Sequence, residues 1–403
     1  MKRFRVTDPS TISNDDLNLV YLKLLSWCRE RDFAGHDPFD ALNSRLFQAS
    51  PFAFSRNARL AFTQLLKRSP ADLRKLVRVP SQRNAKGIAL FALAHLADYR
   101  STKTIESERA ARSLLSDLGE MKLKNYAGAA WGYNFDWQSR NFFARRGTAT
   151  IVPTAFAGRA FIEAGHAFND ERYFQEARSI CDFIVADLPR SVDTTTEVCF
   201  SYAPETSTQI FNASLLAAEV LAAVGAITKE KDLNELARRA TRFVINHQKP
   251  DGSWMYGMEP AQSWIDNFHT AYVLFSLDRI INSIPAASEF RPALSRGYKF
   301  WKDSFFLADG WPKYYHQHPY PVDVHAGASA IVTFLELIGL DSSAAASGEK
   351  IAKWLITNMR DEQGFFYYQR RRFYTVQKPY MRWSQAWMLY ALARLRESRA
   401  VQS

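Results

Sequence analysis

The sequence predicts an all-α fold, an (α/α)6 toroid in which six helical hairpins form a single domain over residues 1–403. Two observations predict it. Apolar helices with few charges alternate along the chain with amphipathic, charged helices. Four successive apolar helices also begin near positions 206, 264, 323 and 382, so the unit repeats at a nearly constant spacing. A helix that is apolar on most sides is buried, and a one-sided helix lies outside it, so the alternation predicts an inner and an outer ring.

The helical pattern starts near the N-terminus, with helices expected from about 14 to 30 and from about 55 to 68. The six apolar helices are expected to begin near 84, 152, 206, 264, 323 and 382. Charged helices follow five of them, near 104, 170, 231, 292 and 342, so the sixth outer helix must come from the N-terminal segment. Gly165, Gly225 and Gly339 are expected to end helices.

The composition fits a globular protein with a large core, since 47% of the residues are hydrophobic. No uninterrupted apolar run long enough to span a membrane is evident, and no apolar segment follows the basic N-terminal residues as in a signal peptide. Cys28, Cys181 and Cys199 show no metal-binding spacing, which favours a reducing compartment and a cytoplasmic location. We therefore predict no metal and no cofactor.

The net charge of +11 is consistent with a solvated basic surface. It is also consistent with three anionic partners: an acidic oligo- or polysaccharide, a lipid-linked sugar precursor, or an anionic membrane surface. Peripheral membrane association is therefore left open, as is the oligomeric state. Nucleic acid is not expected as a partner, because the sequence contains no recognisable nucleic-acid-binding module.

Long aromatic connections precede the apolar helices, and all of them should meet at one rim of the toroid. Concave sites with apolar walls and a few placed polar groups bind small ligands, and aromatic faces suit sugar rings. The aromatic residues that we expect to bind substrate there are Trp131, Tyr133, Trp254, Tyr256, Trp311 and Tyr315.

Three segments carry a resemblance to a known family: DFAGHDPFDALNS from residue 32, DGSWMYG followed by WIDNFHT from residue 251, and KPYMRWSQAWMLYALARL from residue 378. The chain resembles the six-hairpin glycosidase-like superfamily and, more narrowly, bacterial polysaccharide biosynthesis proteins of the Vibrio exopolysaccharide type. The resemblance covers nearly the whole chain and implies a carbohydrate substrate. It implies no single reaction, since members of the superfamily hydrolyse, eliminate or epimerise glycans.

Three carboxylates are candidates for glycoside hydrolysis, which needs one acid and one base or nucleophile. Asp266 and Asp323 stand at matching places before successive apolar helices, and Asp136 lies among aromatic residues. Aspartate is also a favoured helix N-cap, which is the structural alternative for the first two. Hydrolysis by Asp136, Asp266 and Asp323 is the reaction that we place first.

A second mechanism uses His269, which follows Asp266 by three residues, and its counterpart in the next repeat, His325. Imidazoles near neutral pKa are general acids or bases, although a histidine bonded within the core is the plainer alternative. With Asn267, a nearby tyrosine and Arg382, they suggest a lyase or C5-epimerase for a uronic acid. A non-catalytic glycan-binding subunit of a synthesis complex is a third hypothesis.

Arg382, Trp383 and Gln385 open the last apolar helix and complete the predicted substrate site. A buried arginine is costly unless it is paired, so Arg382 should meet a carboxylate of the protein or of the substrate. Trp383 also fits plain core packing, whereas Gln385 does not. Asp37 and Asp40 more simply stabilise a turn than bind sugar.

Overall fold

The computed structural model describes residues 12–139 and 143–402 and confirms the predicted toroid of helical hairpins. Each inner helix packs against the next one along the chain, and the last packs against the first, which closes the ring. The inner helices are α4 (Ala85–Thr102), α6 (Ile151–Phe168), α8 (Phe211–Thr228), α10 (Asn267–Ser283), α12 (Val324–Glu336) and α14 (Trp387–Gln402).

Each outer helix packs against an inner partner and carries charged residues on its outward face. As predicted, the N-terminal segment supplies the sixth of them, α1, which packs against α14. The outer helices are α1 (Asn14–Arg29), α5 (Ile105–Glu120), α7 (Glu171–Ala186), α9 (Lys231–Asn246), α11 (Arg291–Phe305) and α13 (Ala344–Asn358).

Helix α8 shows why the inner ring is so apolar. It has the length and hydropathy of a membrane span, yet 78% of that segment is buried inside the protein. Its one charged residue, Glu219, forms an ion pair of 2.6 Å with Arg159 of α6. Because both the apolar side chains and the single charge find partners within the ring, α8 is a core helix.

Polar side chains fix where the inner helices begin. Asn84, Asp266 and Asp323 are the N-caps of α4, α10 and α12, and each accepts a hydrogen bond from a backbone N–H of the first turn. Helix α8 begins at Phe211, five residues later than the predicted start near Thr206. The reason is that Thr206 and Thr208 bond to the preceding backbone and hold a turn there.

The prediction that glycines end the helices is wrong. Gly165 and Gly225 lie inside α6 and α8, and the left-handed residues after these helices are Asn169 (φ 50°) and Lys229 (φ 63°). A Cβ on Gly165 would lie 2.4 Å from the ring of Phe174, so the glycine allows the outer helix to approach. Gly339 ends only a short 3-10 turn after α12.

Six charged side chains close the end of the ring where the inner helices finish. Arginine and glutamate alternate around it in ion pairs of 2.5–3.1 Å, contributed by α4, α6, α10, α12 and α14. The members of this ion ring, in order, are Arg100, Glu163, Arg279, Glu336, Arg394 and Glu397. Every charge has two partners, which offsets the cost of burying it.

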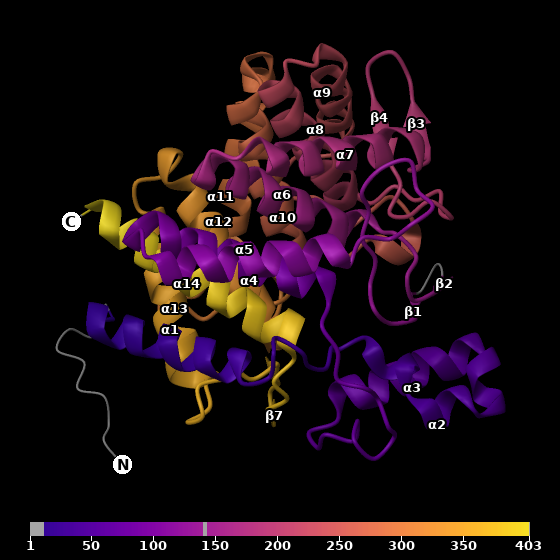
Figure 1. Cartoon of the computed structure of the whole chain (residues 1–403), viewed down its shortest axis with the longest axis vertical. Coiled ribbons are helices and arrows are strands. Elements are labelled where there is room, and N and C mark those ends of the chain that lie inside the picture. Colours follow the sequence, from indigo (N-terminus) through magenta and orange to yellow (C-terminus); the bar gives the residue numbers. More distant parts are fainter. Residues whose placement is uncertain (1–11, 140–142, 403) are drawn as a thin grey trace.

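A small lobe formed by residues 37–82 stands beside the ring and is set apart from it in Figure 1. It contains the helices α2 (Arg45–Gln48) and α3 (Arg56–Arg68). Ala41, Leu66 and Val79 form a core of its own. A buried ion pair of 2.8 Å between Arg74 and Asp40 holds the lobe together.

Short antiparallel strands stiffen the connections that lead from an outer helix to the next inner helix. They form the pairs β1 (Trp137–Gln138) with β2 (Phe143–Ala144) and β3 (Arg190–Asp193) with β4 (Val198–Phe200), and a sheet of β5 (Val322–Asp323), β6 (Gln369–Arg370) and β7 (Thr375–Val376).

Candidate functional site

A cavity of about 480 Å³ lies at the end of the toroid where the inner helices begin. The connections before several inner helices line it, together with the first turns of α4, α10 and α12 and helix α3 of the lobe. Distant aromatic connections therefore do share one rim, as the sequence predicts. We call this space the mouth cavity.

Aromatic side chains form the walls of the mouth cavity. Tyr256 stacks on Trp264 with ring centroids 4.5 Å apart, and Tyr133 stacks on Phe135 at 5.1 Å. Trp383 lines the floor. Flat apolar faces combined with polar groups are typical of a site for a small organic ligand.

His269 and Asp266 form a dyad at one side of the mouth cavity. Nδ1 of His269 lies 2.7 Å from Oδ2 of Asp266, and the same carboxylate accepts the backbone N–H of His269 at 3.0 Å. Trp264 donates its indole N–H to the carboxylate at 2.9 Å. Because a carboxylate only accepts, it fixes the proton on Nδ1 and leaves Nε2 of His269 as an acceptor. His269 lines the cavity, whereas Asp266 is buried behind it.

A hydrogen-bonded chain of Lys86, Tyr272 and His325 lies along the floor. Nζ of Lys86 donates to Oη of Tyr272 at 2.9 Å, and this hydroxyl lies 2.8 Å from Nε2 of His325. Burial lowers the pKa of Lys86 and of His325 well below their usual values, and it raises the pKa of Tyr272. His325 is therefore neutral at neutral pH, and its Nε2 shares a hydrogen bond with the hydroxyl of Tyr272.

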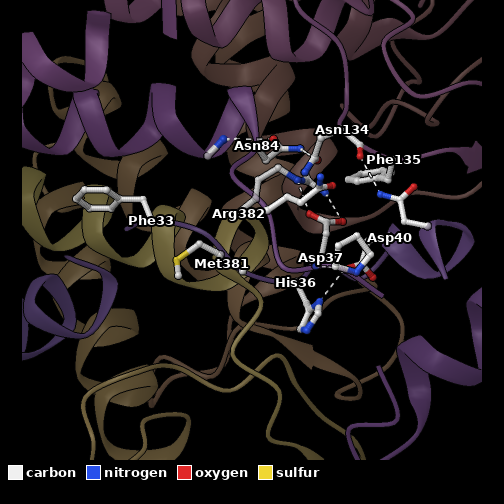
Figure 2. A pocket seen from close by; sticks show the side chains of 14 residues that line it. Phe33, His36, Asp37, Asp40, Asn84, Asn134, Phe135, Met381 and Arg382 are labelled. Atoms are coloured by element: carbon white, nitrogen blue, oxygen red, sulfur yellow. Dashed lines mark hydrogen bonds and ion pairs between the residues drawn. The ribbon is translucent and has the colours of Figure 1, made fainter. Parts of the chain in front are cut away.

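Arg382 is paired with Asp37 of the lobe, which confirms that this buried arginine meets a carboxylate. Two hydrogen bonds of 2.6 and 2.8 Å join the groups (Figure 2). Burial acts to lower the pKa of Arg382, but the carboxylate outweighs it and keeps the guanidinium charged. Asp40 is bonded to Arg74, so both aspartates of this segment have structural roles.

Lys67 and Arg68, at the end of α3, bring positive charge to the mouth cavity. Nζ of Lys67 lies 4.1 Å from the ring centroid of Phe39, and burial lowers its pKa to about 8, so it is mostly charged at neutral pH. Asn212 adds a polar group, because its buried Oδ1 accepts no hydrogen bond from any described residue. Among the residues that the structure describes, no aspartate or glutamate lines this cavity.

The three carboxylates predicted to be catalytic do not line the mouth cavity. Asp266 and Asp323 are buried N-caps. Asp323 also accepts hydrogen bonds from Trp383 at 2.9 Å and Gln369 at 3.1 Å, and burial raises its pKa to about 6. Asp136 accepts the backbone N–H of Arg146 at 2.7 Å and so joins the residue before β1 to the segment after β2.

Six of the residues predicted to bind substrate do line the mouth cavity: Tyr133, Tyr256, Tyr315, His325, Arg382 and Trp383. The other predicted residues serve the fold. Trp131 and Trp254 are buried, and their indole N–H groups bond to the backbone of outer helices. The indole of Trp311 donates to a backbone carbonyl of its own loop.

The amides of Asn267 and Gln385 are also structural. Asn267 donates to the carbonyl of Lys313 and accepts the indole N–H of Trp301 at 2.8 Å. Gln385 makes two hydrogen bonds to the backbone of Phe366. Both side chains therefore join an inner helix to a neighbouring loop.

The sequence prediction missed most of the residues that line the mouth cavity, among them Lys67, Lys86, Asn212 and Tyr272. The position of Lys86 could have been predicted from the sequence, since it is a lysine in the first turn of an otherwise apolar helix, KGIALFALAHL. Such a charge requires partners, and those partners are Tyr272 and the surrounding rings.

A second cavity, of about 550 Å³, lies against the ion ring at the other end of the toroid. No phenylalanine, tyrosine or tryptophan lines it among the described residues, and Glu163, Glu219 and Glu336 are engaged there with arginines. Across residues 12–139 and 143–402, no group of three or more His, Cys, Asp or Glu side chains is arranged to hold a metal ion. The mouth cavity is therefore the better candidate site.

No family model matches this sequence, and no curated protein matches it by sequence. Solved structures match the fold. A cellobiose 2-epimerase from Bacillus thermoamylovorans is 12% identical, with a TM-score of 0.63 over 97% of this chain and 100% of that one. A family 76 α-mannanase from Bacteroides thetaiotaomicron is 12% identical, with a TM-score of 0.63 over 78% and 87%. A polysaccharide lyase is 9% identical, with a TM-score of 0.59 over 96% and 97%.

These matches show that the chain has the six-hairpin glycosidase-like fold. They confirm the fold that the broader part of the resemblance implies. The narrower resemblance, to exopolysaccharide biosynthesis proteins of the Vibrio type, stays a prediction.

Proposed function

We propose that the chain is a carbohydrate-active enzyme that removes a proton from C5 of a uronic acid, leading to elimination or to epimerisation. The observation that carries this proposal is the chemistry of the mouth cavity. Its lining offers imidazole, phenol and amine groups, and no aspartate or glutamate among the described residues. Proton transfer at carbon needs such groups, whereas the usual glycoside hydrolysis needs two carboxylates.

His269 is the proposed general base. Asp266 holds the proton on Nδ1 and orients the ring, so Nε2 is the acceptor that meets the substrate. The pair places a basic imidazole nitrogen at the cavity with a buried carboxylate behind it. That carboxylate stabilises the imidazolium formed when C5 gives up its proton.

Tyr272 is the proposed acid. Its ring centroid lies 6.4 Å from that of His269, and both side chains line the mouth cavity, so the two groups are neighbours in the site. In elimination, C5 loses its proton to His269, the C4–O4 bond breaks, a C4=C5 double bond forms, and Tyr272 protonates the departing oxygen. In epimerisation, Tyr272 returns a proton to the opposite face of C5. Lys86 and His325 hold its hydroxyl, and Lys86 stabilises the phenolate.

The substrate class follows from charge. A carboxylate at C5 makes the C5 proton more acidic, and the negative charge that develops on it needs a cation. Lys67 and Arg68 supply positive charge at the cavity, and the aromatic walls suit sugar rings. The solved structures that share the fold include an epimerase and a polysaccharide lyase, which supports carbohydrate chemistry of this kind.

Hydrolysis by Asp136, Asp266 and Asp323 has less support than the sequence alone suggests. All three side chains are engaged by backbone or indole donors outside the lining of the mouth cavity. A role in polysaccharide biosynthesis and a cytoplasmic location stay predictions, since they rest on sequence resemblance and cysteine content.

Incubation of the protein in deuterated water with oligosaccharides of different uronic acids tests the proposal. An epimerase incorporates deuterium at C5, which nuclear magnetic resonance detects, and a lyase forms an unsaturated uronate that absorbs ultraviolet light. His269→Gln should abolish either signal while saccharide binding persists. Cleavage to saturated sugars would instead support a hydrolase, and binding with no exchange or cleavage by the wild type would support a non-catalytic binding subunit.

A further inference from the structure

Several large apolar side chains of the lobe beside the mouth cavity are highly exposed to solvent. Among the described residues, four large hydrophobic side chains are more than 70% exposed: Phe54 (86%), Leu76 (73%), Phe373 (86%) and Val401 (84%). The first two belong to the lobe, where Phe52 is also 64% exposed. Exposed apolar groups that gather in one region mark a surface that another apolar phase covers.

The lobe also holds nearly half of the net positive charge of the protein. Residues 37–82 contain eight arginines and lysines and three aspartates, which gives a net charge of +5 against +11 for the whole chain. The exposed cations alternate along the sequence with the exposed apolar residues. Arg45 precedes Leu46, and Lys75 and Arg78 flank Leu76.

The hairpin of β6 and β7 extends this surface. Oη of Tyr374 donates to the carbonyl of Arg68 at 3.3 Å, so the tip of the hairpin lies against the end of α3. Arg372 and Phe373 are both exposed at this tip. Two segments separated by some 300 positions in the sequence thus bring the same combination of an exposed aromatic ring and a cation to one place. We call the lobe and this tip the basic apolar rim.

We propose that the basic apolar rim docks on an anionic lipid bilayer. Aromatic and aliphatic side chains that project singly among cations enter the boundary between headgroups and acyl chains, while each cation attracts anionic headgroups. A protein partner with an acidic patch would match the charges, but separate protruding rings such as Phe54 and Phe373 suit a fluid layer that closes around each one.

Docking in this way would bring the mouth cavity to the membrane surface. Helix α3 joins the two features, since Leu60, Gln64 and Lys67 line the cavity and Leu65, on an adjacent face, is 58% exposed. A saccharide attached to a lipid could then enter the cavity without leaving the bilayer. The docking proposal does not depend on the reaction catalysed.

Sedimentation of the full chain with lipid vesicles tests the proposal. We expect binding to vesicles of phosphatidylcholine with phosphatidylglycerol, weakened by salt, and little binding to phosphatidylcholine alone. Lys75→Gln with Arg78→Gln should weaken binding about fivefold for each charge removed. Phe54→Ser with Phe373→Ser should also lower it.

The matched control is Ile105→Ser, because Ile105 is 66% exposed but lies far from the mouth cavity. It is the first residue of α5 and follows the end of α4, and the cavity lies where α4 begins. It should bind vesicles like the wild type, and circular dichroism should show that all variants fold. The proposal is overturned if anionic vesicles do not bind the protein, or if the rim variants bind as well as Ile105→Ser. A dimer that the phenylalanine variant abolishes, without vesicle binding, would assign the rim to a second copy of the chain and also overturn it.

Discussion

Replacing Asp37 by asparagine should destabilise the protein strongly, because it leaves the guanidinium of Arg382 buried without a countercharge. The side chains of the pair are 7% and 4% exposed, and two hydrogen bonds of 2.6 and 2.8 Å join them. Breaking such a pair by removing one partner costs about 3–5 kcal/mol. The asparagine has nearly the same shape, so loss of charge rather than a cavity is responsible.

The loss should appear as a lower melting temperature. An unfolding entropy of about 2.1 cal/mol/K per residue gives about 0.85 kcal/mol/K for this chain, so the shift should be about 4–6 °C. Differential scanning calorimetry measures it. Asp182→Asn is the matched control, because Asp182 pairs with Arg178 on the surface, where such pairs contribute at most about 1 kcal/mol.

A double variant separates charge from packing. Arg382→Met combined with Asp37→Asn should recover part of the lost stability, since no uncompensated charge is then buried. If Asp37→Asn shifted the melting temperature no more than Asp182→Asn, the pair of Asp37 and Arg382 would not be a stabilising buried ion pair between the lobe and the ring.

Three further predictions concern the ion ring and the site. Burial alone would raise the pKa of Glu163, but neighbouring guanidiniums hold that pKa at about 2. The ionised side chain therefore contributes about 3 kcal/mol to the free energy of unfolding above pH 4.5, and this contribution is lost as the pH falls toward 2. Thermal melts of Glu163→Gln should lack this pH-dependent loss. Burial lowers the pKa of Lys67 to about 8, so calorimetry should show weaker binding of an acidic saccharide above that pH, and Lys67→Gln should bind weakly at every pH. Asp266→Asn should lower turnover by about 10⁴-fold with the fold intact, because His269 then takes the wrong tautomer; a tenfold loss or less would contradict this.

The architecture was predictable because it depends on the average character of whole helices. The alternation of apolar and charged helices identifies the inner and outer rings without any contact being known. The helix ends were less predictable. Gly165 serves close packing against Phe174, and Asn169 takes the left-handed conformation instead, a choice that depends on the neighbouring helix.

The site was predictable in part. The aromatic rim and His269 follow from the connections and the first turns of the inner helices. The sequence does not show in which direction a side chain at the start of a helix points. An aspartate at such a place can face the cavity, or it can accept a hydrogen bond from a backbone N–H of its own helix. Asp266 and Asp323 take the second course. Lys86 and Tyr272 were missed because their partners come from helices far apart in the sequence.

A crystal structure of the His269→Gln protein with a bound oligosaccharide of uronic acids would show whether the mouth cavity is the reaction site. We predict a sugar ring against Tyr256 and Trp264, its carboxylate beside Lys67, and C5 between position 269 and the hydroxyl of Tyr272. A saccharide bound at the cavity beside the ion ring, or one whose scissile bond lies beside Asp136 or Asp323, would contradict the mechanism proposed for the mouth cavity.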